Sequence, residues 1–238
     1  ANAPAPNGSD NEQHMAWLIA EVKRLVRWSG GGAFVLFTSY RAMNQVAEAT
    51  RPGFEAAGMA TYVQGELPKV EMVKQFAAAE HGVLYGTRSF FEGVDVKGAA
   101  LRLVILDRLP FEPLTPLRAA EDRALVQWAE ENLTLKPGEL EWYPFNQITV
   151  PRMVVDLKQV FGRLIRTQTD YGVFAVLDNR ARTRPYGRRQ VLPALPRCPD
   201  LWSMEQVADF YYQRGANGNG QVTLTSTEAA LAKALYQA

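Results

Sequence analysis

Short apolar runs alternate with helix-like stretches along most of this chain, and this alternation is the feature that most constrains its fold. Five runs of five to seven residues suit strands, and the first of them suits a strand buried on both faces: 33–38, 60–64, 82–86, 101–107 and 172–178. Helical patterns lie between them at 11–28, 41–57 and 68–79, the second with an expected break near Pro52-Gly53. The alternation predicts an α/β fold, with a mostly parallel sheet covered by helices on both faces.

The segments that follow the five runs are polar and rich in hydroxyl groups, glycine and arginine. In a parallel sheet, functional groups gather outside the carboxyl ends of the strands. We therefore expect one edge of the sheet to bind phosphate. The segments are 38–40, 64–65, 86–89, 107–108 and 178–180.

Composition along the chain indicates three parts. Residues 1–13 have the character of a linker or of the truncated end of a larger protein. Residues 14–199 carry the strand and helix alternation, interrupted by a helical excursion at 109–158 that includes a helix at 117–132. Residues 200–238 form an expected helical appendage, with helices at 204–214 and from Ser226 to the end.

Charge and composition narrow the class of protein. The net charge is only +1, but residues 151–190 hold eight Arg and one Lys against three Asp. Such a cluster suits a phosphate-bearing partner, and a solvated arginine face is an equally open interpretation. No run approaches the roughly 18 apolar residues of a membrane-spanning helix, and the N-terminus lacks the pattern of a signal peptide. A cytoplasmic location fits.

Cysteine and histidine offer no metal chemistry. Cys198 is the single cysteine, so the chain can form no internal disulfide and cannot supply the thiolates of an iron–sulfur cluster. His14 and His81 are isolated, and no grouping has metal-ligand spacing. We expect no metal site.

The stretch QVFGRLIR, residues 159–166, carries the most specific chemistry. On a helix, Gln159, Arg163 and Arg166 share one face, because residues three and four apart are neighbours. Two guanidinium groups beside an amide can clamp the charge of a transferring phosphoryl group. A bare R-x-x-R more often pairs with carboxylates on a surface, but the complete eight-residue pattern favours the phosphoryl clamp.

At these residues the chain resembles the second RecA-like domain of superfamily 2 helicases, in the DinG/XPD branch of DNA helicases, and bacterial DinG proteins more than eukaryotic relatives. The aspartate and glycine before the last strand and the segment Tyr186-Gly187-Arg188 continue the resemblance. It implies a RecA-like fold. It also implies that Arg163 and Arg166 act as catalytic arginine fingers and that Gln159 contacts ATP.

A second segment, GTRSFFEGVDVKG at 86–98, resembles the fifth helicase motif of the same branch. The resemblance implies that one part of this loop faces DNA and another faces the nucleotide. Aromatic rings in and outside the loop (Phe90, Phe91, Tyr143 and Phe145) are able to stack on bases, although buried aromatics are commoner. The implied DNA contacts are Thr87, Arg88, Ser89 and Phe90, and the implied ATP contacts are Glu92, Gly93 and Asp95.

Three shorter segments agree with this resemblance. FVLFTSY at 34–40 is similar to the fourth motif, which implies that Thr38 and Ser39 contact a DNA phosphate; the same hydroxyls can cap a helix. Gln64-Gly65 is similar to a short element that contacts the DNA backbone. Asp107 to Phe111 is similar to the family's K-L-P-F segment, with Arg108 in the lysine's place. The resemblance spans about 33–196.

The sequence contains no G-x-x-x-x-G-K-[ST] loop, so it lacks the parts that hold ATP phosphates and Mg²⁺. By resemblance, a first motor domain of the same polypeptide supplies them, and in many relatives that domain carries the iron–sulfur cluster. We expect the chain alone to hydrolyse no ATP, and the complete protein to move 5′ to 3′ on single-stranded DNA in repair or replication. A stand-alone module for single-stranded nucleic acid, or a scaffold that docks a protein through 180–189 or the C-terminal helix, remains open.

Overall fold

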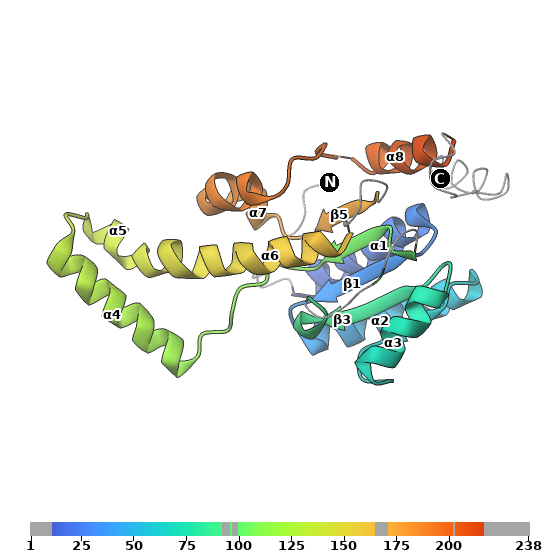
Figure 1. Cartoon of the computed structure of the whole chain (residues 1–238), viewed down its shortest axis with the longest axis horizontal. Helices are drawn as coiled ribbons and strands as arrows, with labels where there is room; N and C mark the ends of the chain where they lie inside the picture. Colours follow the sequence, from blue (N-terminus) through green and yellow to red (C-terminus); the bar gives the residue numbers. More distant parts are fainter. Residues whose placement is uncertain (1–10, 92–95, 97–99, 165–170, 202, 217–238) are drawn as a thin grey trace.

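Five parallel strands form one sheet at the centre of the structure (Figure 1). The structure is a computed structural model, which describes residues 11–91, 96, 100–164, 171–201 and 203–216. The strands lie in the order β2-β3-β1-β4-β5. This confirms the predicted parallel sheet, with strands slightly shorter than the apolar runs. Their bounds are β1 (Ala33–Phe37), β2 (Thr61–Val63), β3 (Val83–Thr87), β4 (Leu103–Leu106) and β5 (Val173–Val176).

Helices cover both faces of the sheet. Successive side chains of each strand point to opposite faces, so both faces carry apolar side chains that the helices bury. On β1, Val35 and Phe37 face one core, which α1 (Asn11–Ser29), α2 (Tyr40–Ala56) and α8 (Met204–Ala216) complete. Phe34 and Leu36 face the other core, together with α3 (Lys69–Ala78) and α6 (Val150–Leu164). The remaining short elements are η1 (Arg88–Phe90), α7 (Arg180–Thr183), η4 (Gly187–Val191) and η5 (Leu192–Ala194).

The predicted break at Pro52-Gly53 is wrong, because α2 continues through both residues to Ala56. Proline removes one backbone donor from a helix and usually ends or kinks it. Here Met43, Thr50 and Phe54 keep one face of the helix buried on both sides of the proline. Packing against the sheet therefore outweighs the local cost of Pro52.

The excursion between β4 and β5 projects away from the sheet (Figure 1). It consists of α4 (Pro116–Asn132), α5 (Pro137–Glu141) and a π-helical turn, η3 (Phe145–Thr149), that leads directly into α6. In α4 only Arg118 and Ala129 are buried. The excursion is thus attached to the domain mainly at its base rather than along its length.

The helix α8 belongs to the segment that the sequence marks as an appendage, yet it packs into the same core as α1. Val207 and Tyr211 are buried there. The Tyr211 hydroxyl also donates to the carbonyl oxygen of Arg102 at 2.7 Å, just before β4. The helix predicted from Ser226 to the end lies outside the described residues.

Candidate nucleic-acid and nucleotide interface

The carboxyl ends of the strands lie at one edge of the sheet and carry polar side chains. The strand register sets Phe37 of β1 opposite Thr87 of β3, and Leu36 opposite Leu106 of β4. The first polar residues after β1 and β4 therefore emerge side by side. The prediction that the polar segments gather at one edge is confirmed, and the residues involved are Thr38, Gln64, Thr87, Asp107 and Asp178.

At this edge Asp107 fixes the start of the segment 38–40. Its carboxylate accepts from the Thr38 backbone amide at 2.9 Å and from the Thr38 hydroxyl at 3.5 Å. Asp107 is buried, whereas Thr38 and Ser39 are exposed. The Ser39 hydroxyl accepts from the Ala42 amide at 3.2 Å, which confirms that it caps α2. Thr38 is therefore exposed at the edge of the sheet, and the buried Asp107 carboxylate holds it in place.

The buried Asp107 carboxyl gives a testable pH dependence. Burial raises the pKa of Asp107 to about 6, against the opposing effect of the Thr38 hydrogen bond. The folded protein therefore binds this proton more tightly than the unfolded chain, and stability falls as the pH rises from about 4 to about 6. The expected loss is about 2–3 kcal/mol. Urea unfolding from about pH 4 to about pH 7 measures it. Asp107→Asn should lack this decline, and equal declines in both proteins would contradict the assignment.

Gln64, which follows β2, connects the end of β3 to the start of α2. Its Oε1 atom accepts from the Thr87 amide at 2.7 Å and from the Thr87 hydroxyl at 2.9 Å, while its Nε2 atom donates to the Tyr40 hydroxyl at 2.5 Å. The side chains of Gln64 and Thr87, both expected to contact DNA, are therefore hydrogen-bonded to each other. Their contact with DNA stays a prediction. What the structure adds is a bridge that sequence spacing did not indicate.

Phe90 requires a correction, because its side chain is only 1% exposed. The ring packs over Gly86, where an added Cβ atom would come within 2.9 Å of the ring carbons Cγ and Cδ2. It belongs to the core on the α3 and α6 side of the sheet. A ring buried in this way has no face free for a base, so we no longer assign Phe90 to DNA contact.

Arg88 and Ser89 are exposed at the same edge, immediately after β3. The Arg88 guanidinium pairs with Asp156 of α6 and lies 3.5 Å from a carboxylate oxygen of Glu112. The Ser89 carbonyl oxygen accepts from the Lys69 ammonium. Both residues are thus positioned where the resemblance expects DNA, and Arg88 is held between carboxylates.

The last turn of α6 brings the two most specific sequence motifs together. Arg163 lies there, and its Nε atom donates to the carbonyl oxygen of Phe91 at 3.0 Å. Phe91 directly follows η1, within the loop that resembles the fifth motif. Residues 72 positions apart in the chain therefore meet beyond the carboxyl end of β3.

Gln159 lies one turn earlier on α6. Its side-chain Oε1 atom is buried and has no hydrogen-bond partner among the described residues. A buried acceptor of this kind is costly unless something donates to it. The other residues that the sequence assigns to the nucleotide lie outside the described residues: Glu92, Gly93, Asp95 and Arg166.

Asp178 organises the end of β5. It is buried and accepts from the Leu109 amide at 2.9 Å and from the Arg180 amide at 3.0 Å. The Arg180 guanidinium also donates to both of its carboxylate oxygens, at 2.7 Å from Nη2 to Oδ2. One carboxylate thereby joins β5, the loop after β4 and the start of α7.

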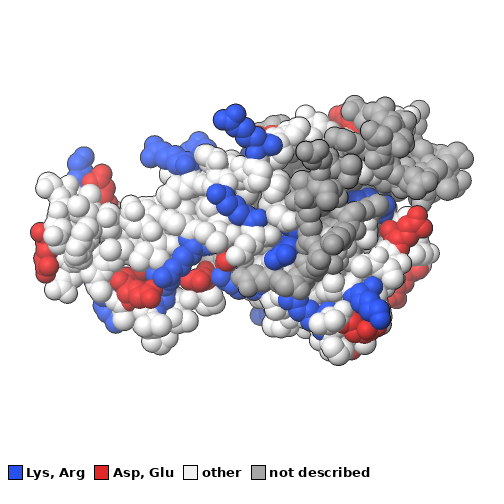
Figure 2. Space-filling view, viewed as in Figure 1, with Lys and Arg blue, Asp and Glu red and all other residues white. Residues whose placement is uncertain are grey.

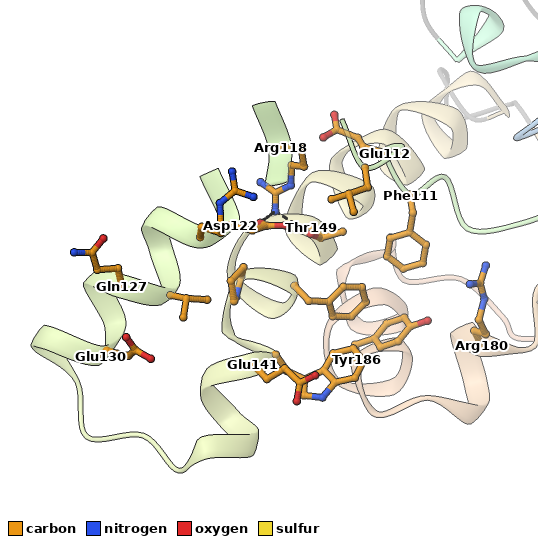
Figure 3. Close-up of a pocket in the computed structure, with 16 residues that line it drawn as sticks. Phe111, Glu112, Arg118, Asp122, Gln127, Glu130, Glu141, Thr149, Arg180 and Tyr186 are labelled. Atoms are coloured by element: carbon orange, nitrogen blue, oxygen red, sulfur yellow. Dashed lines mark hydrogen bonds and ion pairs between the residues drawn. The ribbon is translucent and has the colours of Figure 1, made fainter. Parts of the chain in front are cut away.

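A pocket of about 710 Å³ opens between the excursion and the segment around Tyr186 (Figure 3). Phe145 is one of the lining residues, and its ring centroid lies 5.6 Å from that of Phe111 and 5.2 Å from that of Tyr186. The Arg180 guanidinium stands 5.5 Å from the centroid of Phe111. Sequence reasoning singled out Phe145 but missed the pocket, since its walls come from separate stretches of the chain between Phe111 and Tyr186.

Basic side chains project from the surface over α7, with few acidic side chains around them (Figure 2). This agrees with the arginine-rich composition of 180–189. Among the described residues, no group of His, Cys, Asp or Glu is arranged to hold a metal ion. No helix in that part of the chain is long and apolar enough to span a membrane.

Comparison with known proteins agrees with this geometry. A family profile described as the helicase C-terminal domain matches residues 22–196. The chain is 41% identical over 180 residues to the ATP-dependent DNA helicase YoaA of Haemophilus influenzae, covering 76% of this chain and 26% of that protein. It is 34% identical over 185 residues to the ATP-dependent helicase DinG of Mycobacterium tuberculosis, covering 77% of this chain and 25% of that one. The chain thus spans about a quarter of the length of these relatives.

Two solved structures share the fold. One is S. tokodaii Xpd4, with a TM-score of 0.52 and 13% identity over 80% of this chain and 36% of that chain. The other is an XPD helicase, with a TM-score of 0.53 and 16% identity over 83% of this chain and 33% of that chain. The prediction of a RecA-like fold is confirmed.

Proposed function

The chain belongs to the helicase C-terminal domain family of DinG, YoaA and XPD-like DNA helicases, and from this membership we propose that it is the second motor domain of an ATP-dependent 5′-to-3′ DNA helicase. In this role it contacts single-stranded DNA along the carboxyl edge of its sheet. It also donates arginines to an ATP site that it shares with a first motor domain of the same polypeptide.

The contact between Arg163 and Phe91 carries this proposal. It joins the arginine motif on α6 to the loop after β3, which are the two segments that the resemblance assigns to the nucleotide. Guanidinium groups in this place stabilise the negative charge that spreads over a transferring phosphoryl group. The buried oxygen of Gln159 on the same helix, which has no hydrogen-bond partner in the described part of the chain, supports a ligand beside it.

ATP and Mg²⁺ are then held mainly by the first motor domain, because this chain has no P-loop. This chain contributes side chains to the ATP site rather than the loop that holds the phosphates. In this proposal Arg163 and Arg166 act on the transferring phosphoryl group, and Glu92, Gly93 and Asp95 have the nucleotide-contacting role that the resemblance implies. An iron–sulfur cluster, where the complete protein carries one, lies outside this chain, whose single cysteine cannot hold it.

The DNA contacts follow from exposure at the same edge. Thr38, Ser39 and Ser89 present hydroxyl groups, and Arg88 presents a guanidinium; all four are exposed. Backbone amides and hydroxyls suit phosphate without regard to base sequence. Gln64 and Thr87 contribute by holding the neighbouring strand ends in place.

We expect the 238-residue chain to bind a labelled single-stranded oligonucleotide with an affinity that falls as salt rises, because each phosphate contact releases a counterion. Arg88→Ala should weaken binding about tenfold at low salt and lower the log–log salt slope by about 0.7. The matched control is Arg24→Ala on α1, whose side chain is similarly exposed, at 52% against 44%. Fluorescence anisotropy measures both.

Loss of affinity in Arg88→Ala alone supports the proposal. Equal losses in the two variants would contradict the placement of DNA at this edge. No salt-dependent binding by the unmodified chain would favour the protein-docking alternative.

A further inference from the structure

Arg88 is held by two carboxylates, one on α6 and one in the segment between β4 and α4. Its Nη2 atom pairs with Asp156 of α6 and lies 3.5 Å from Glu112 Oε1, while its Nη1 atom donates to the Pro110 carbonyl oxygen at 3.4 Å. We call Asp156 and Glu112 the carboxylate clamp. The sequence pattern assigns no role to either residue.

The clamp is the first part of a chain of ion pairs that runs to the base of α4. Arg152 lies 3.6 Å from Glu112 and 3.2 Å from Glu121. Arg118 pairs with Glu121 at 3.1 Å and also donates to the Thr149 hydroxyl at 2.9 Å. Figure 3 shows Arg118 directed at Asp122 and Thr149, and Figure 2 shows acidic and basic side chains side by side near the start of α4.

The charges around Arg88 determine how the carboxylate clamp affects the binding of a phosphate. Arg152 also contacts Glu112, so the two guanidinium groups and the two carboxylates sum to a net charge of zero, and the positive charge of Arg88 is already balanced before a phosphate arrives. Both Nη atoms of Arg88 are already engaged by protein acceptors. Arg88 can neutralise a phosphate fully only if these carboxylate pairs are given up.

We propose that Asp156 and Glu112 set the affinity of this edge for single-stranded DNA, by competing with a DNA phosphate for the Arg88 guanidinium. This inference rests on the proposed function, in which Arg88 contacts DNA. Binding of the phosphate frees the pairs that tie α6 and the segment around Glu112 to the strand edge. The position of the excursion then responds to whether DNA occupies that edge.

The size of the effect follows from exposure. The side chains of Arg88 and Glu112 are 44% and 38% exposed, and pairs of this kind are weak. Removing both carboxylates should therefore raise affinity by about two- to tenfold at low salt, with a smaller gain at high salt.

The test is a cycle of variants in the 238-residue chain, read by anisotropy with a fluorescent oligothymidylate at about 50 and about 200 mM salt. The clamp variant is Asp156→Asn with Glu112→Gln, made in the unmodified chain and again with Arg88→Ala. The control is Glu130→Gln with Glu131→Gln on α4, which removes the same charge from exposed positions away from Arg88. Circular dichroism confirms that each variant is folded.

The expected result is a gain in affinity that requires Arg88. A gain of equal size in the Arg88→Ala background, or in the α4 control, would show a general charge effect and overturn the clamp. A loss of affinity would show that the carboxylates orient Arg88 instead, and would also overturn it. If Arg88→Ala alone leaves binding unchanged, the DNA contact in the proposed function fails; if it weakens binding while the clamp variant changes nothing, only the clamp fails.

Discussion

Replacing Arg163 with alanine in the complete polypeptide is expected to reduce ATP turnover by about 10³–10⁵-fold while leaving single-stranded DNA binding unchanged. The guanidinium lies at the end of α6 and donates to the carbonyl oxygen of Phe91, and the proposed function assigns it to the nucleotide rather than to DNA. Charge stabilisation in the transition state is therefore lost without the loss of a DNA contact.

Steady-state ATPase assays with and without DNA, combined with anisotropy, measure this separation. Arg163→Lys retains the charge but not the planar set of donors, so it should recover only part of the rate. Arg24→Ala on α1 is the matched control and should turn over normally. Normal turnover by Arg163→Ala would remove the arginine-finger assignment, and ATP hydrolysis by the 238-residue chain alone would show that it needs no first domain.

Asp178→Ala is expected to destabilise the folded domain by about 3–5 kcal/mol. The carboxylate is buried and accepts from two backbone amides and the Arg180 guanidinium. Alanine removes the acceptor and leaves the Leu109 amide and the Arg180 charge without this partner, and such losses are costly in a buried site.

Chemical denaturation measures the change, and two variants make it specific. Asp178→Asn keeps an acceptor oxygen and should lose less stability than alanine. Asp209→Ala on α8 changes an exposed aspartate and should stay within about 0.5 kcal/mol of the unmodified chain. A loss below about 1 kcal/mol in Asp178→Ala would mean that the junction of β5, α7 and the loop after β4 does not depend on this carboxylate.

The sheet could be predicted from the sequence because its three central strands, β1, β3 and β4, are buried on both faces. Runs such as 33–37 are apolar at every position, which sets them apart from the one-sided pattern of the helices. Pro52 shows where local rules failed: the continuity of α2 depends on Phe54 reaching the core, and that contact is tertiary. Phe90 failed for a similar reason, since only the register of η1 over Gly86 decides that its ring turns inward.

The interface was predictable in part. Motif spacing correctly brought Thr38, Thr87 and Arg88 to one edge, because parallel strands end together. It did not predict that Gln64 is bonded to Thr87, or that Arg88 is held by Glu112 and Asp156. Both arrangements depend on side chains from separate elements meeting in space, and no local pattern records such a meeting. The DNA and ATP roles of these residues stay predictions.

The helix α8 lies beyond the end of the family match but packs into the core of the folded domain. The match to the helicase family ends at residue 196. Tyr211 nevertheless donates a hydrogen bond to the carbonyl oxygen of Arg102 and is buried in the same core as α1. The family match and the folded core therefore have different bounds. A boundary drawn at the end of the family match would strip an apolar surface of its cover, so a design that transplants this motor domain should carry the chain at least through residue 216.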